Sequence, residues 1–269
     1  ALIREMSKEP TLCTELVSGL PAYFGYSDAC KTGAGGVWFG GTDFIRPIVW
    51  RLKWPHDLTK RFLSSSNKRD DITINDLECA VTLLNWLVLE TVVPSLRHKH
   101  TATYGDNTPT ISVTRRMKST KSKRSNDLVH ALAVRQRACR ASPLSPLFVA
   151  GRLNKMADVA SRSYNPKESY FSPSPRDLLT KFTKLFPLPQ SESWHLVILP
   201  NRISSLVFSA LRGDLSTVES WQRITKKGTS IGKLGTNSPP TVEWTHNLMI
   251  LTQMPNGSLP SPVSLNASG

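Results

Sequence analysis

Four acidic residues of this 269-residue chain lie where a carboxylate could take part in metal chemistry. Asp28 follows an apolar run in "AYFGYSDAC", Glu78 lies in "INDLECAV", Asp106 in "YGDNTPT" and Asp158 in "NKMADVASR". A charge at the end of a buried strand is costly unless something pairs with it. Converging carboxylates repel one another unless cations join them, and their hard oxygen ligands suit Mg²⁺ or Mn²⁺. Two such ions about 3.5–4 Å apart can clamp the attacking water and the leaving oxygen of a phosphodiester.

Each of these acids also has an ordinary structural explanation. Asp28 could start a turn, and Glu78 could be a surface acid of a helix. Asp106 with Asn107 could form an Asx turn, and Asp158 could be a first-turn acid favoured by the helix dipole. The occurrence of all four at the ends or early turns of expected elements favours the metal site over four separate explanations.

The first elements expected to position these acids are three strands and a helix. Residues 22–53 contain short aromatic runs bounded by glycine, which predict three consecutive antiparallel strands. A polar loop is expected over residues 57–71. Residues 73–90 carry apolar side chains at steps of three and four, which predicts a helix, and Thr73 with Asp76 forms a capping-box pattern at its start. The apolar positions are Ile74, Leu77, Val81, Leu84 and Val88.

Further elements are expected up to residue 163. A strand ends at Gly105, a helix begins near Thr108, another helix runs through "DLVHALAVRQRAC", and a short strand covers "PLFVA". Asn154 is the candidate cap of a last helix. The order β-β-β-α-β-α-α-β-α predicts an α/β domain whose five-stranded mixed sheet is flanked by helices. Strand ends at one edge of a sheet are neighbours, so this fold would bring the four acids together.

The chain divides into three regions by composition. Residues 1–19 are expected to be a linker from an upstream polypeptide, since the sequence has no start methionine. Residues 20–163 form the expected domain. Residues 164–269 are an irregular C-terminal extension rich in Pro, Ser and Thr, with a strand in "HLVILP", helices in "ISSLVFSALRG" and "STVESWQRI", and a disordered tail. These pieces could pack on the domain or bind a partner.

The charge balance predicts a nucleic-acid partner. The chain has 34 Lys and Arg against 20 Asp and Glu, a net charge of +14; a basic but inert surface is the alternative. The densest basic run covers residues 115–124 and could grip a phosphate backbone or be a solvated loop. Its cations are Arg115, Arg116, Lys118, Lys121, Lys123 and Arg124. No apolar run approaches the roughly 20 residues of a membrane span, so no membrane partner is expected.

The four acidic segments resemble, in order, the motifs of a known family. "YSDACKTGAGGVWF", "INDLECAVTLL", "YGDNTPT" and "VAGRLNKMADVASR" are similar to the four acidic motifs of ribonuclease H domains. The similarity is greatest to the domains that follow reverse transcriptase in retrotransposon polyproteins of the Gypsy and DIRS kinds. It covers about residues 20–163, and the last segment is the most specific. Its matching positions are Gly151, Asn154, Ala157, Asp158, Ser161 and Arg162.

The resemblance implies an intracellular enzyme, in the cytoplasm or nucleus, that cuts the RNA strand of RNA–DNA hybrids during reverse transcription. Asp28, Glu78, Asp106 and Asp158 would hold two Mg²⁺ ions, with Mn²⁺ as a substitute. Water on one ion would attack the phosphorus, and the second ion would stabilise the departing 3′ oxygen. The family context implies an upstream reverse transcriptase domain and a downstream recombinase or integrase in the same polyprotein.

Secondary roles in nucleic-acid binding follow from the same resemblance. Asn107 and Asn154 would assist at the edge of the site, and the basic run would hold the hybrid. No polymerase motif of the "YxDD" type occurs, so DNA synthesis is not expected of this chain.

The sequence also departs from the family pattern. Gly105 stands where Thr is usual, Cys30 replaces Ser, Phe148 replaces His and Ala150 replaces Pro. The missing His leaves open which group assists product release or proton transfer. Two other functions remain as alternatives: an inactive domain of a degenerate element that only binds nucleic acid or braces a polyprotein, and a transposase or integrase built on the same sheet.

Overall fold

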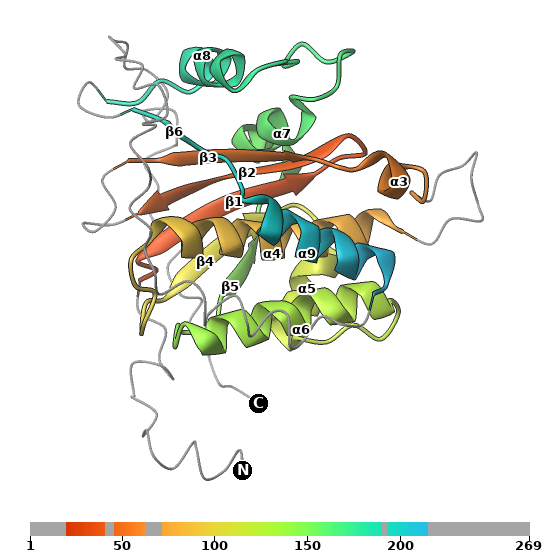
Figure 1. The fold of residues 1–269 in the computed structure, drawn as a ribbon. Helices are drawn as coiled ribbons and strands as arrows, with labels where there is room; N and C mark the ends of the chain where they lie inside the picture. The colour runs from red at the N-terminus through yellow and green to blue at the C-terminus, as the bar shows by residue number, and fades with distance from the viewer. Residues whose placement is uncertain (1–19, 41–45, 63–71, 190–192, 215–269) are drawn as a thin grey trace, which may run out of the picture.

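The computed structural model describes residues 20–40, 46–62, 72–189 and 193–214 (Figure 1). The strands are β1 (Tyr23–Ala29), β2 (Gly33–Gly40), β3 (Ile48–Lys53), β4 (Thr101–Gly105), β5 (Ser145–Phe148) and β6 (His195–Val197). The helices are α3 (His56–Thr59), α4 (Ile74–Val92), α5 (Thr108–Arg116), α6 (Lys123–Ala138), α7 (Lys155–Arg162), α8 (Pro175–Leu185) and α9 (Asn201–Arg212), with a 3₁₀ turn, η1, at Gly151–Leu153. None of these helices is long and apolar enough to cross a membrane.

The sheet is mixed, with strand order β5-β4-β1-β2-β3-β6. β1, β2 and β3 are consecutive antiparallel strands, as predicted, and β4 and β5 extend the sheet in parallel beyond β1. The expectation of five strands is wrong, because β6 of the C-terminal extension adds a sixth strand that is parallel to β3. The sheet edge at β3 is therefore covered by residues from beyond the expected domain.

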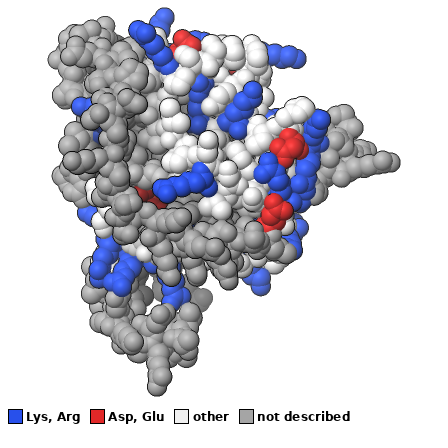
Figure 2. Space-filling model, in the orientation of Figure 1, with Lys and Arg blue, Asp and Glu red and all other residues white. Residues whose placement is uncertain are grey.

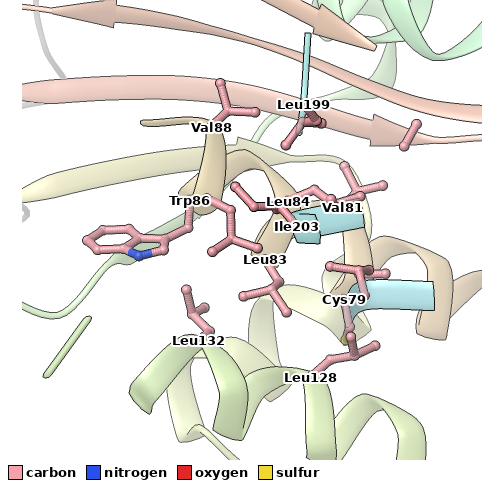
Figure 3. Packing of buried hydrophobic residues seen from close by; sticks show 14 of the residues in the cluster. Cys79, Val81, Leu83, Leu84, Trp86, Val88, Leu128, Leu132, Leu199 and Ile203 are labelled. Carbon is pink, nitrogen blue, oxygen red and sulfur yellow. The ribbon is translucent and has the colours of Figure 1, made fainter. Parts of the chain in front are cut away.

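The larger hydrophobic core lies between the sheet and helices α4, α6 and α9. Figure 3 shows apolar side chains of α4 facing Leu128 and Leu132 of α6, with Leu199 and Ile203 beside them. The indole N–H groups of Trp38 and Trp50 donate to Asn85, at 2.7 Å to its carbonyl oxygen and 2.8 Å to its side-chain oxygen. Because Asn85 is fully buried, these bonds fix α4 against β2 and β3.

A second, smaller core covers the other face, where α7 and α8 lie (Figure 1). Val37 and Val49 of the sheet pack against Val159 of α7 and Phe182 of α8. Gly35 of β2 permits this close approach, because a Cβ atom there would meet the backbone nitrogen of Ser161 at 2.4 Å. The contact positions α7, and with it Asp158, against the sheet.

We expect Gly35→Ala to lower the free energy of unfolding by about 1–3 kcal/mol, since its new methyl group would collide with the α7 backbone. Gly105→Ala is the matched control, because a Cβ atom there has no neighbour within 4 Å. Urea unfolding of both variants measures the difference. Equal stability of the two variants would contradict the close packing of α7 on β2.

Most predicted elements are confirmed, with shifts at their boundaries. The capping box of α4 forms between Thr73 and Asp76. α5 is capped by Asn107, one residue before the predicted Thr108. Residues 56–59, at the start of the expected loop, form the short helix α3. The strand in "HLVILP" and the helix in "ISSLVFSALRG" are present as β6 and α9.

α8 was not predicted, although its start has recognisable signals. Ser174 caps it in a capping box with Asp177, and Pro175 occupies its first turn. The N-terminal linker, the helix in "STVESWQRI" and the disordered tail lie outside the described residues. So does most of the polar loop expected over residues 57–71.

Candidate metal centre

The positions of Asp28 and Asp106 are set by the register of two adjacent parallel strands, β1 and β4. Tyr26 of β1 pairs with Tyr104 of β4, and their rings stack with centroids 4.9 Å apart. Asp28 and Asp106 each lie two residues further along. Asp28 lies near the end of β1 and Asp106 directly after β4, so both acids stand at the carboxyl ends of these neighbouring strands.

The third acid, Glu78, comes from the first turns of α4. The capping box fixes where this helix begins, and packing on β1 and β2 fixes its orientation. The backbone N–H of Ala29 donates to the Glu78 carboxylate at 3.3 Å. Glu78 thus reaches the end of β1, although it is only 7% exposed.

Asp28, Glu78 and Asp106 form one cluster, called here the carboxylate triad. One carboxylate oxygen from each lies within 4.8 Å of the other two. Asp28 and Glu78 are buried, and Asp106 is the most exposed of the three. No other three-acid, histidine or cysteine group of this kind occurs among the residues that the structure describes.

Burial disfavours the charged forms of two triad members. Burial raises the pKa of Asp28 to about 6; the Ser161 hydroxyl, which donates to Asp28 at 2.5 Å, opposes this, while the charges of Asp158 and Asp106 add to it. Burial also raises the pKa of Glu78 well above its usual range, and the charges of Asp28 and Asp106 add to it. A divalent cation would relieve both the desolvation and the repulsion, so the triad fits such an ion.

The fourth acid, Asp158, lies beside the triad but does not join it. Its carboxylate accepts a hydrogen bond from the Arg162 guanidinium, one helical turn further along α7. Asp158 is nevertheless near enough for its charge to raise the pKa of Asp28. Of the four predicted acids, three therefore form the triad, and the fourth, Asp158, pairs with an arginine beside it.

An open groove of about 430 Å³ gives access to the triad. Besides the three acids, its lining includes Lys31, Asn107 and Arg162. Cations and an amide therefore flank the carboxylates at a solvent-accessible surface. That combination can bind a metal ion and, next to it, a phosphate group.

The two predicted asparagines have different positions. Asn107 lines the groove; its side-chain oxygen caps α5 by accepting from the Thr110 N–H, and its amide donates to the side chain of Asn75 at 2.9 Å. Asn154 is only 1% exposed, and its amide donates to the carbonyl oxygen of Ser27 at 3.1 Å. Asn154 therefore joins α7 to β1 and is too buried to contact a ligand at the surface. It occupies the predicted cap position of α7, but its side chain makes no cap hydrogen bond.

The basic run 115–124 is divided between the end of α5, a short connection and the start of α6. Most of its cations are exposed. On the face of the molecule drawn in Figure 2, Lys and Arg are more frequent than Asp and Glu among the described residues. Arg124 differs in being half-buried, and its guanidinium donates to the carbonyl oxygen of Leu211 at the end of α9. The exposed cations are Arg115, Arg116, Lys118, Lys121 and Lys123.

Four residues of the site had no predicted role. Ser161 and Arg162 match the last motif, and their spacing of three and four from Asp158 places them on its side of a helix. Asn75, three residues before Glu78, could have been found by the same helical spacing. No local pattern distinguishes Lys31 from other surface lysines.

Comparison with models of known protein families finds no match, and comparison with curated proteins finds none either. The triad, the groove and the motif resemblance are therefore the features that point to a function.

Proposed function

We propose that this chain is a divalent-metal-dependent nuclease of the ribonuclease H type, which cuts the RNA strand of RNA–DNA hybrids. The observation that supports it most is the carboxylate triad. Three acids separated by 50 and 28 positions in the chain bring their oxygens within 4.8 Å of one another, at the open end of two parallel strands. Keeping buried acids so close without a cation would destabilise the fold for no structural benefit.

The residues of the site divide the expected chemistry among them. Asp28, Glu78 and Asp106 would hold the metal, and Asp158 would complete the set of four ligands that the motif resemblance implies. Bound Mg²⁺, or Mn²⁺ in its place, would supply an activated water and charge stabilisation for the departing 3′ oxygen. The Ser161 hydroxyl orients the Asp28 carboxylate, and the buried Asn154 holds α7 against β1.

The proposed substrate class comes from Lys31 in the groove, from the exposed cations of the basic run and from the resemblance. Lys31 and the exposed cations of residues 115–123 offer contacts to phosphates. Contacts of this kind do not depend on the base sequence of the nucleic acid. The amides of Asn75 and Asn107 at the rim offer hydrogen bonds to sugars or bases. The choice of an RNA–DNA hybrid among nucleic acids rests on the similarity of the four motifs to ribonuclease H domains.

The same resemblance supports a biological setting. The chain would act inside the cell, in the cytoplasm or nucleus, as part of a retrotransposon polyprotein. Its partners there would be an upstream reverse transcriptase and a downstream recombinase or integrase.

A cleavage assay tests the proposal. We expect the protein to cut the labelled RNA strand of a hybrid in Mg²⁺ or Mn²⁺, to lose this activity in EDTA, and to leave a DNA duplex intact. Binding of the hybrid without cutting in either metal would support the alternative of an inactive nucleic-acid-binding domain. Cutting of the DNA duplex would instead support a transposase or integrase.

A further inference from the structure

Arg162 lies where it can control the fourth acid of the site. It is the last residue of α7, and its Nε atom donates to Asp158 Oδ1. Its Nη1 atom lies 3.5 Å from Glu168 Oε1, in the segment after α7. It also lines the groove over the triad together with Asp28. One guanidinium thus connects Asp158, the groove and the start of the C-terminal extension.

The Asp158–Arg162 pair can exchange partners easily. The Arg162 side chain is 42% exposed and that of Asp158 is 33% exposed. Ion pairs this accessible to water contribute little stability, because solvent screens them and replaces their hydrogen bonds. A divalent cation bound at the triad would attract the Asp158 carboxylate more strongly than a single guanidinium can. Arg162 would keep a partner after the exchange, since Glu168 is already within reach.

We propose that Arg162 is a latch, a positioning residue that holds Asp158 away from the carboxylate triad until a divalent cation binds and takes Asp158 over. This inference rests on the proposed metal site, and it adds that Arg162 competes with the metal for the Asp158 carboxylate. It also gives the first residues after α7 a role, because Glu168 receives the released arginine. The latch has a thermodynamic consequence: the factor by which the Asp158–Arg162 pair weakens metal binding equals the factor by which bound metal weakens the pair.

Titration of the whole chain with Mg²⁺ alone, followed by calorimetry, tests the latch. We expect Arg162→Met to tighten Mg²⁺ binding by about 2- to 5-fold, the factor that corresponds to an exposed ion pair. In an Asp158→Asn background the same substitution should change the Mg²⁺ affinity much less, because the carboxylate that Arg162 holds is absent. Unequal effects in the two backgrounds measure the coupling between the two residues.

Lys31→Met separates the latch from general electrostatics. Lys31 is an exposed cation that lines the same groove, so its loss also removes positive charge near the metal. We expect its effect on Mg²⁺ affinity to be the same with Asp158 or Asn at position 158, unlike that of Arg162→Met. A second measurement follows the Arg162 Nε–H resonance by NMR, which should shift during Mg²⁺ titration as its carboxylate partner leaves.

The outcomes separate the latch from the nuclease proposal. Equal effects of Arg162→Met in both backgrounds, or an Nε–H resonance that does not respond to Mg²⁺, would overturn the latch even if hybrids are cut. Coupled effects on Mg²⁺ binding without hybrid cleavage would support the latch and overturn the nuclease. Failure of every variant to bind Mg²⁺ would overturn both.

Discussion

Asp28→Asn should reduce hybrid cleavage by at least about 10³-fold and, at the same time, raise the free energy of unfolding of the metal-free protein by about 2–3 kcal/mol near pH 8. The loss of cleavage follows from the loss of several kcal/mol of charge stabilisation by the metal. The gain in stability follows from the burial of Asp28, whose pKa is raised to about 6. An ionised Asp28 without a cation destabilises the fold because its charge is buried. A neutral amide removes this cost and can still accept the Ser161 hydrogen bond.

Asp76→Asn is the matched control, because Asp76 is a buried acid of the same helix, two residues before Glu78. Its carboxylate is 1% exposed but accepts hydrogen bonds from the Thr73 N–H at 2.9 Å and from the Ser122 and Ser125 hydroxyls. The amide cannot accept all of these bonds, so this variant should lose about 1–3 kcal/mol. It should retain cleavage, since Asp76 is not part of the triad.

Urea unfolding in EDTA and cleavage assays in Mg²⁺ would be run on both variants. Opposite signs of the stability change distinguish a buried acid that needs a bound cation, as proposed for Asp28, from one whose hydrogen bonds stabilise the fold, as for Asp76. If Asp28→Asn lowers stability as Asp76→Asn does, Asp28 has a structural role and the metal site fails.

The central elements were predictable because each has a local cause. The three-strand meander has short aromatic runs bounded by glycine, and α4 has both an apolar face and a capping box. β6 and α8 are different. A strand was predicted where β6 lies, but its pairing with β3 was not, because the free edge of β3 is a property of the assembled sheet. α8 lies in a Pro- and Ser-rich stretch whose composition masked a valid helix start.

The site was predictable to the extent that it follows from strand order. Asp28 and Asp106 end neighbouring strands, and Glu78 lies on the helix that packs across them, so the topology brings them together. The orientation of Asp158 could not be predicted in this way. Its helix is correctly located, but its carboxylate pairs with Arg162 one helical turn away, and the sequence spacing does not decide between this pairing and an orientation toward the triad.

The pH dependence of stability should separate the metal-free from the metal-bound protein. The folded-state pKa of Asp28 is about 6, against an ordinary value of 3.8, so the folded protein binds this proton more tightly than the unfolded chain does. The resulting stabilisation is complete below about pH 4 and is lost as the pH rises through 6, a decrease of about 3 kcal/mol from Asp28 alone. Glu78, whose pKa is also raised by burial, contributes in the same direction.

Mg²⁺ should reverse this decrease, because it binds the ionised triad of the folded state and not the unfolded chain. Unfolding would be measured from about pH 4 to pH 8 in EDTA and again in excess Mg²⁺. The net charge of +14 also changes stability with pH, and Asp28→Asn corrects for it, since this variant keeps the background charge but lacks the Asp28 titration. The difference in unfolding free energy between wild type and variant should grow from pH 4 to pH 7 in EDTA. If this difference in unfolding free energy stays constant with pH, burial does not raise the pKa of Asp28. The proposal that a cation compensates for its burial would then fail.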